Sequence, residues 1–257
     1  SPGTVLIYSQ FDDVEGIELI SRVLNNVLKY KELKLKRNKD TKQWDITLPS
    51  DNVPTFIKFR PDTNLTGKSK IEYTNIVLSI FNNDFDKLPD NIKAKLRNKS
   101  NLRGDILKVL FISKSGAEGI SLKNVRQVHI TEPYWNKNRI DQVIGRANRT
   151  CSHIALPVSE RNFVVYTYTM KFTKEQIENK KNKPIVMRSD KGLTTDETIY
   201  QIANKKHKII SQFLESMQKV AVDCPLNNAG VGCFAFPVDL SSSTKAYTLD
   251  IAKDTLD

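Results

Sequence analysis

The chain has 257 residues, enough for one large domain, or for one domain with an appendage, around a substantial core. Its 40 lysines and arginines exceed its 29 aspartates and glutamates. The resulting net charge of +11 favours a polyanion such as nucleic acid as partner, although charge alone does not exclude an anionic membrane surface. Apolar runs stay below the ~18 residues that a membrane span needs, and no signal-peptide pattern opens the chain. We therefore expect a soluble intracellular protein.

The cysteines point to a reducing compartment. Cys151, Cys224 and Cys233 are too few and too scattered for a disulfide framework, and their number is odd, so we expect three free thiols. Cys224 and Cys233 could supply half of a zinc site, but no second Cys/His pair stands nearby at ligand spacing, and no metal site is predicted. Because residues 1–3 lead directly into an apolar run, we expect the chain to be a piece of a longer protein.

Strands and helices alternate over the first two thirds of the chain. Short continuous apolar runs, typical of strands buried on both faces of a parallel sheet, predict strands at residues 5–8, 55–59, 109–112, 127–130 and 163–168. Helical spacing predicts a helix over 71–81 and one over 15–30, the latter with a stripe through Ile17, Ile20, Leu24, Val27 and Leu28. This alternation predicts an α/β fold, with a mostly parallel sheet covered by helices on both faces.

Other stretches interrupt or follow this alternation. Residues 29–39 and 82–103 are polar and basic, and are either solvated insertions or a ridge that faces nucleic acid. Residues 171–193 have the composition of a charged connector. Thr194 and Glu197 form a capping-box pattern, which predicts the start of a long helix. Its apolar stripe runs through Ile199, Ile202, Ile209, Phe213, Met217 and Val220.

The segment "QVIGRANRT", residues 142–150, predicts a two-faced helix. Its apolar face comprises Ile140, Val143, Ile144 and Ala147, and its opposite face comprises Gln142, Arg146 and Arg149. A merely solvated face would be served as well by lysines and carboxylates, whereas guanidinium groups are fork-shaped, permanently charged and suited to phosphate oxygens. Gly145 costs about 1 kcal/mol inside a helix, which also argues for a special role. We interpret the polar face as an anion clamp.

The segment "SKSGAEGISL", residues 113–122, follows the strand at 109–112. Ligands of doubly wound sheets bind at the carboxyl ends of parallel strands. Gly116 and Gly119 would let backbone amides approach an anion, and Ser113, Ser115 and Ser121 would supply hydroxyl groups. The alternative is an ordinary turn between a strand and a helix.

Together these segments resemble known motifs. "SKSGAEGISL", a strand ending in "HITEPYWN", and "QVIGRANR" resemble motifs V and VI of superfamily 2 helicases and translocases, and "VLIYSQF" resembles motif IV. The resemblance covers residues 4–170, although residues 35–103 depart from the family pattern. The tail that begins "TTDETIYQIANKKHK" resembles the extension in helicases of large nucleocytoplasmic DNA viruses, a group that includes the poxvirus early transcription factor small subunit and nucleoside triphosphatase I.

The resemblance implies roles for particular residues. It implies a RecA-like domain over 4–170 with an insertion around 30–103, a connector over 171–193 and a helical extension over 194–257. Arg146 and Arg149 would be arginine fingers, which stabilise the charge that spreads over a departing phosphoryl group. The residues implied to face the nucleotide are Gln142, Gly145 and Gly119. The residues implied to contact nucleic acid are Ser9, Gln10, Ser113, Lys114 and Gly116.

The resemblance also implies cofactors and partners. ATP and Mg²⁺ would be held mainly by a first RecA domain that this chain lacks, so the chain by itself should be nearly inactive. The expected partners are nucleic acid, with DNA favoured over RNA, the N-terminal RecA domain of the same protein and viral transcription subunits, with no membrane. The expected location is the host cytoplasm, in the viral factory, and the virion. The alternative function is a non-catalytic module for nucleic-acid binding or transcription assembly.

One motif matches only part of a known nucleotide-binding pattern. "TGKS", residues 66–69, copies the end of a Walker A loop, the phosphate-binding loop of many ATPases. The full motif needs a glycine five residues before Gly67, where Asp62 stands with a carboxylate that would repel phosphate. We therefore expect no autonomous nucleotide site around Lys68.

Overall fold

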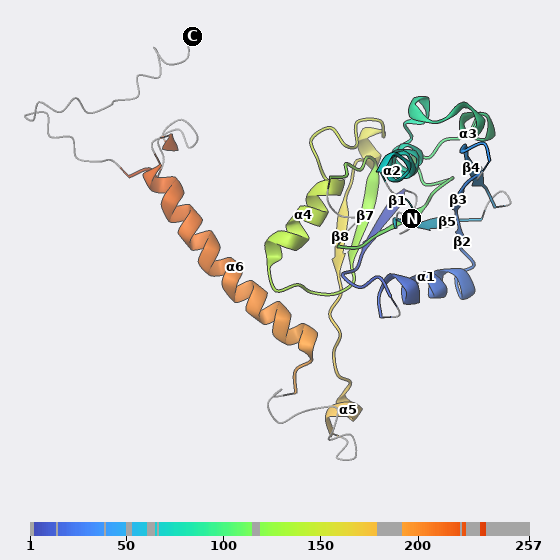
Figure 1. The fold of residues 1–257 in the computed structure, drawn as a ribbon. Coiled ribbons are helices and arrows are strands. Elements are labelled where there is room, and N and C mark those ends of the chain that lie inside the picture. Colours follow the sequence, from blue (N-terminus) through green and yellow to red (C-terminus); the bar gives the residue numbers. More distant parts are fainter. Residues whose placement is uncertain are drawn as a thin grey trace, which may run out of the picture. The chain divides into compact units, whose positions relative to one another are not determined.

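The computed structural model describes residues 3–13, 15–38, 40–49, 53–60, 65, 67–114, 119–178, 192–221, 223–224 and 232–234. The chain divides into two compact units, residues 1–201 and residues 202–257. Figure 1 shows the elements of both units.

The first unit is built on a six-stranded sheet in which every neighbouring pair of strands is parallel. The strands are β1 (Thr4–Tyr8), β2 (Lys31–Glu32), β5 (Thr55–Lys58), β6 (Val109–Ile112), β7 (Val125–Ile130) and β8 (Val164–Thr167). Their spatial order is β2-β5-β6-β1-β7-β8. All five strands expected from the sequence are present, and the parallel α/β fold is confirmed. Strand β2 was not expected, because its two residues carry no apolar run.

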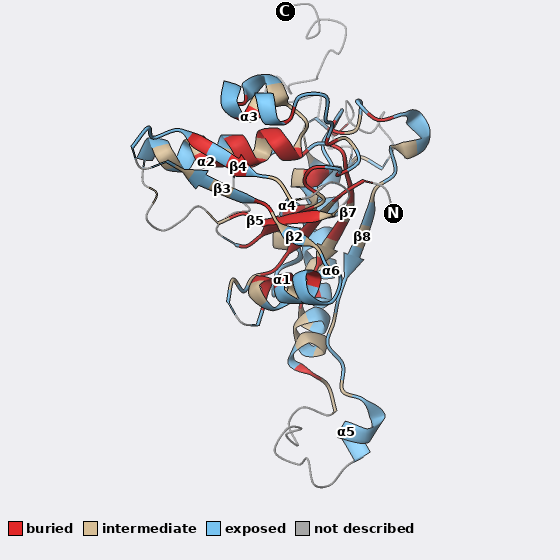
Figure 2. Cartoon of the chain, turned by 90° about the vertical axis from the view of Figure 1, so that its right-hand side faces the viewer, coloured by how far each residue is buried: buried red, intermediate tan, exposed pale blue. Residues whose placement is uncertain are grey.

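Helices cover both faces of this sheet (Figure 1). The covering helices are α1 (Ile17–Asn26), α2 (Gly67–Phe81), α3 (Asp90–Lys95) and α4 (Lys137–Ala147). On one face α1 contributes Ile17 and Leu24 to a small core with Phe56 and Phe111. On the other face the larger core takes residues from α2, α3 and α4. Figure 2 shows that the buried residues concentrate in the sheet and on the helix sides turned toward it.

Helix α1 is shorter than the sequence pattern indicated. It ends at Asn26, and the chain turns at Lys29, whose φ is +60°, before entering β2. The expectation that Val27 and Leu28 lie in the buried stripe is therefore wrong, because their side chains are 68% and 56% exposed. The apolar spacing of the sequence continues to Leu28, but the turn toward β2 ends the helix at Asn26.

The insertion forms a second, two-stranded sheet. Its strands β3 (Lys34–Arg37) and β4 (Trp44–Thr47) are antiparallel, and the 3-10 helix η1 (Phe85–Lys87) precedes α3. The buried Trp44 ring lies 5.8 Å from that of Tyr73 on α2, and its indole N–H donates to Glu72 at 3.1 Å. Asn91 on α3 donates to the Trp44 carbonyl. The hairpin of β3 and β4 is thus packed through β4 against α2 and α3.

The capping box opens a long helix, as the sequence predicted. Helix α6 (Thr195–Val220) follows the short α5 (Lys174–Glu178) and the 3-10 helix η2 (Val158–Glu160). The Thr194 amide donates to the Glu197 carboxylate, and the Glu197 amide donates to the Thr194 hydroxyl, both at 3.1 Å. The reciprocal bonds satisfy two amide donors at the helix start.

The second unit corrects the expectation for two cysteines. Cys224 and Cys233 form a disulfide, with Cα atoms 5.8 Å apart, so they are not free thiols. The chain returns toward α6 here, since the Phe234 amide donates to the Lys219 carbonyl at 2.7 Å. That return brings two cysteines nine positions apart within bonding reach. Cys151 is a free, exposed thiol, as expected.

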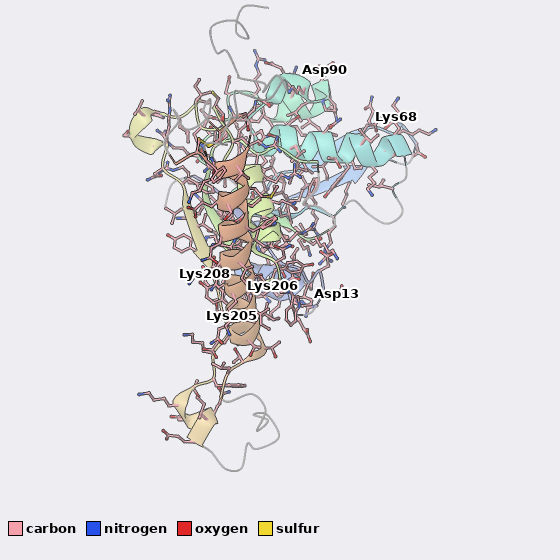
Figure 3. The ribbon with its side chains drawn as sticks, turned by 90° about the vertical axis from the view of Figure 1, so that its left-hand side faces the viewer. Asp13, Lys68, Asp90, Lys205, Lys206 and Lys208 are labelled. Atoms are coloured by element: carbon pink, nitrogen blue, oxygen red, sulfur yellow. A yellow bond between two sulfur atoms is a disulfide. The ribbon has the colours of Figure 1, made fainter. Side chains whose placement is uncertain are left out.

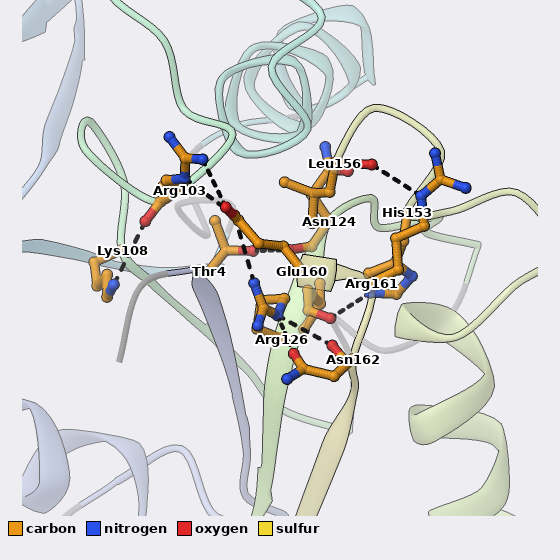
Figure 4. A network of polar contacts seen from close by, with 11 residues as sticks. Thr4, Arg103, Lys108, Asn124, Arg126, His153, Leu156, Glu160, Arg161 and Asn162 are labelled. Carbon is orange, nitrogen blue, oxygen red and sulfur yellow. Dashed lines mark hydrogen bonds and ion pairs between the residues drawn. The ribbon is translucent and has the colours of Figure 1, made fainter. Parts of the chain in front are cut away.

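A network of arginines closes the amino edge of the main sheet, where its strands begin (Figure 4). Arg103 binds Glu160 through two hydrogen bonds, at 2.7 and 3.1 Å. Arg126 is 8% exposed, and its Nε donates to the Asn162 carbonyl at 3.1 Å. Arg126 also lies 3.8 Å from the same Glu160 carboxylate. The network joins the segments before β6 and β8 to the first residues of β7.

Candidate functional site at the carboxyl edge

The carboxyl ends of the strands all meet at the opposite edge, because the sheet is parallel. Ser9 and Gln10 follow β1, Ser113 and Lys114 follow β6, and Glu132 follows β7. The chain leaves β1 toward β2 on one side and later crosses from β6 over β1 to β7. Such a reversal of direction marks the place where doubly wound sheets bind their ligands.

Glu132 joins the ends of β1 and β7. One of its carboxylate oxygens accepts from the Ser9 hydroxyl at 2.9 Å and from the Gln10 amide, and the other accepts from the Thr131 hydroxyl. The Gln10 side chain donates to the Pro133 carbonyl at 3.0 Å. Ser9 is buried and its hydroxyl serves this junction, so its place in the fold is that of a positioning residue. Glu132 was not singled out from the sequence, where its only signal was an acidic residue at the end of a predicted strand.

Arg139, in the first turn of α4, links three elements. Its guanidinium donates to the Lys114 carbonyl at 3.0 Å, which ties α4 to the end of β6. It also interacts with the hydroxyl of Tyr8, the last residue of β1. Burial raises the pKa of Tyr8, and the Arg139 charge opposes that shift. Arg139 was also not singled out, because an arginine before the "QVIGRANR" motif has no pattern of its own.

The loop after β6 is joined to α4 at both of its ends. Beyond the Lys114 contact, the Leu122 amide donates to the Arg146 carbonyl at 3.0 Å, and Arg149 donates to the Ile120 carbonyl at 3.4 Å. Gly119 is exposed with φ +74°, and no atom lies within 4 Å of the position that a Cβ would take. Ser113 is buried and Lys114 is exposed, whereas Gly116 lies outside the described residues. Hydrogen bonds therefore connect the loop expected to bind nucleic acid to α4 and to Arg149, which follows it.

Helix α4 presents its polar side as the spacing predicted, with one exception. The Asn136 side chain caps the helix by accepting from the Asn138 amide, and Val143 and Ala147 are buried. Gln142 and Gly145 are exposed and Arg146 is half-buried. The helix ends at Ala147, so the expectation that Arg149 continues the helical stripe is wrong. The Asn148 backbone leaves the helical region there, which places Arg149 on the turn that follows.

The two arginines are available to an anion. Neither Arg146 nor Arg149 forms an ion pair with a described carboxylate. Permanently charged guanidinium groups suit the oxygens of a phosphate. A Mg²⁺ ion would need oxygen ligands instead, and the described residues hold no cluster of three or more His, Cys, Asp or Glu side chains fit for a metal. This edge fits the phosphates of a nucleotide better than its metal ion.

Two further observations bear on the sequence predictions. Lys68, from the incomplete Walker A pattern at residues 66–69, is exposed in the first turn of α2 (Figure 3). The Gly67 backbone has φ +51°. Trp135, in the connection between β7 and α4, is 49% exposed. Among the described helices, none combines the length and apolar character of a membrane span.

Comparison with known families identifies the class of protein. Residues 68–151 match the family described as the helicase conserved C-terminal domain. That segment includes β6, β7, α4 and the connections between them, which form the carboxyl-edge site. The match shows that residues 68–151, on a RecA-like sheet, carry a helicase conserved C-terminal domain, and the chain is similar to helicases of large nucleocytoplasmic DNA viruses.

Two of its relatives come from such viruses. The chain is 33% identical over 238 residues to the termination factor NPH-I homolog of African swine fever virus (isolate Tick/Malawi/Lil 20-1/1983), a match that covers 91% of this chain and 32% of that protein. It is 40% identical over 174 residues to a putative ATP-dependent RNA helicase of Acanthamoeba polyphaga mimivirus, covering 63% of this chain and 20% of the relative. The chain thus spans about a third or less of these relatives. The solved structure of the C-terminal part of the Fun30 ATPase domain is 15% identical, with a TM-score of 0.37, and covers 82% of this chain and 48% of that one.

Proposed function

We propose that this chain is the second motor domain of a nucleic-acid-dependent ATPase and that it supplies Arg146 and Arg149 to ATP held by a first RecA domain. The observation that carries the proposal is the placement of both arginines beside the loop after β6, without a described carboxylate partner. ATP and Mg²⁺ would be bound mainly outside this chain. The guanidinium groups would stabilise the charge that spreads over the phosphoryl oxygens as the terminal phosphate departs.

The connected loop and helix support a route from nucleic acid to ATP. Nucleic acid bound at Gln10 and Lys114 would press on the loop of residues 113–122. Because that loop is bonded to Arg146 and Arg149, its displacement would shift the fingers relative to the nucleotide. Gln142, one turn before Arg146, would contact the same nucleotide, and the exposed Gly145 would leave room for it.

The biological setting is part of the proposal. A relative named as a termination factor and relatives named as RNA helicases support a role in viral transcription. We propose viral transcription subunits as partners and the host cytoplasm and virion as locations. We favour DNA over RNA as the nucleic acid, and measurement of ATPase stimulation by each decides between them.

The test is ATP hydrolysis by the full-length protein with and without nucleic acid. Arg146→Ala and Arg149→Ala should each lower stimulated turnover by about 10³-fold or more, since arginine fingers contribute ~10³–10⁵ in rate. Arg161→Ala is the matched control, because Arg161 is exposed and lies before β8, at the amino edge of the sheet opposite the site. This chain alone should show almost no turnover. Robust hydrolysis by the chain alone, abolished by Lys68→Ala, would contradict the proposal.

A second candidate function is a non-catalytic module for nucleic-acid binding or transcription assembly, which the exposed Lys114 and the basic insertion would suit. It is favoured if Arg146→Ala leaves stimulated ATPase intact while weakening the binding of nucleic acid or of a protein partner.

A further inference from the structure

A polar groove lies on the first unit between α1 and the β3–β4 hairpin. Its volume is about 540 Å³. Its lining comes from α1, β2, β3, β4 and β5 and comprises Glu18, Ser21, Arg22, Asn25, Lys31, Glu32, Lys34, Thr47, Pro49, Phe56 and Lys58. The lining therefore holds four cationic side chains and two carboxylates. None of its residues belongs to the motifs at the carboxyl edge.

The carboxylates of the groove are already neutralised. Lys58 lies 3.1 Å from Glu18 and 3.4 Å from Glu32, and Arg22 lies 3.2 Å from Glu18. The Lys58 hydrogen bond, followed by that of Arg22, lowers the pKa of Glu18, so this carboxylate stays ionised and paired. Lys31 and Lys34 are exposed and form no ion pair with a described carboxylate. The positive charge that faces solvent belongs to them.

The hairpin extends this charge beyond the groove. Lys34 and Lys36 are alternate residues of β3, so both side chains point to the same face, and both are exposed. Their cross-strand neighbours on β4 are Thr47 and Asp45. Lys95 of α3 binds the Asp45 carboxylate at 2.7 Å, which neutralises the acidic charge in this row. A lysine some sixty positions away in the sequence thus neutralises the carboxylate that faces Lys36, which leaves the charge of Lys34 and Lys36 uncompensated by it.

We propose that Lys31, Lys34 and Lys36 form a second nucleic-acid-binding surface that contacts the phosphate backbone without reading its sequence. This inference rests on the proposed function, which supplies the polyanion. Alternate residues of a strand lie about 7 Å apart, which equals the rise along the helix axis of about two phosphates on one strand of a duplex. Asn25 and Thr47 stand among the cations and can bond phosphate or sugar oxygens, as polar side chains do in positioning contacts. The surface would hold nucleic acid while the motor motifs at the carboxyl edge move along it.

The test is the salt dependence of nucleic-acid binding by the full-length protein, measured with a labelled duplex and a labelled single strand. In the variant carrying Lys31→Gln, Lys34→Gln and Lys36→Gln, the Kd should rise about tenfold, equally for unrelated sequences. The slope of log Kd against log salt should become shallower by about one for each phosphate that a lysine no longer neutralises. Lys36→Gln alone should give about a third of the change in slope. The Tm of each variant should match that of the wild type, because these side chains are exposed.

The matched control removes the same charge elsewhere. Lys205, Lys206 and Lys208 are exposed lysines of α6 (Figure 3), and their replacement by glutamine should leave the affinity and slope near wild type. An equal loss of affinity in this control would show an effect of net charge and overturn the proposed surface. Unchanged affinity and slope in the variant that replaces Lys31, Lys34 and Lys36 would also overturn the proposed surface. An acidic protein would then be the partner to seek. If the wild type bound no nucleic acid at all, the proposed function itself would fail.

Discussion

Arginines gather at both edges of the main sheet, but they are used differently. At the amino edge, Arg103 and Arg126 share the carboxylate of Glu160, and Arg126 is nearly buried. At the carboxyl edge, Arg146 and Arg149 are bonded to the loop after β6 through backbone groups, namely the Leu122 amide, which donates to the Arg146 carbonyl, and the Ile120 carbonyl, which accepts from Arg149. A guanidinium that is paired with a carboxylate stabilises the fold, whereas one without a carboxylate partner can bind an anionic ligand.

The difference follows from the fold and not from the residue type. Segments that enter a parallel sheet on its amino side must be tied together, and a carboxylate between two guanidiniums does so at the cost of desolvation. The carboxyl side is where loops and helix ends converge on a ligand. Three changes test this contrast, after the replacement of Arg146 or Arg149, for which we expect the largest effect.

Arg139→Ala should have the largest effect among these three. It removes the bond to the Lys114 carbonyl and the interaction with Tyr8, which releases one end of the loop of residues 113–122. Nucleic-acid-stimulated turnover of the full-length protein should fall by about tenfold to a hundredfold, since small misplacements of reacting groups cost that much. The KM for ATP should change little, and Arg139→Lys should restore part of the stimulation. A lower Tm with unchanged stimulation would instead assign Arg139 to stability alone.

Arg126→Ala should destabilise the fold without a specific effect on catalysis. The change leaves the Asn162 carbonyl without the Nε donor and removes one cation from Glu160, at a cost of about 2 kcal/mol. Urea unfolding of this chain measures the change in stability. Arg103→Ala, whose side chain is 54% exposed, is the matched control and should cost less. If Arg126→Ala lowered stimulated turnover per folded molecule, the contrast between the two edges would not hold.

Glu160→Gln should produce the smallest effect, and one that depends on pH. The hydrogen bond from Arg103 lowers the pKa of Glu160. A lowered pKa in the folded state contributes stability above the pKa of the unfolded chain, and this contribution is lost as pH falls through the folded pKa. The Tm of Glu160→Gln should therefore lie below that of the wild type at pH 7, and the two should converge in acid. A constant difference in Tm across this range would show that packing, and not charge, explains the effect.

The sequence predicted the parts of the site that repeat a local pattern. The buried runs predicted β1, β6 and β7, and the spacing of Val143 and Ala147 predicted the buried side of α4. It did not predict where α4 stops, because the Ala147–Asn148 boundary depends on a backbone turn and not on the apolar period. It also gave no sign of Glu132 and Arg139, whose partners come from strands and loops more than twenty positions away.

The insertion and the cysteines show the same limit. The basic stretches at residues 29–39 and 82–103 were left as either solvated insertions or a nucleic-acid ridge. Only the structure showed that β3 pairs with β4 and that β4 packs on α3 through the contact of Trp44 with Asn91. The spacing of Cys224 and Cys233 gave no reason to expect a disulfide, which needed the return of the chain toward α6.

The sequence by itself determined the parallel α/β class, the strands β1, β5, β6, β7 and β8, and the helix that carries Gln142 and Arg146, because each depends on apolar periods within about fifteen neighbouring residues. The tertiary structure alone decided which side chains meet. Strand order brought Ser9 to Glu132, and Lys114 to Arg139, across more than a hundred and about twenty-five positions respectively. It also placed Arg126 against its carboxylate and left Arg146 and Arg149 without a described one, since charge pairing depends on distances in space that no local pattern records.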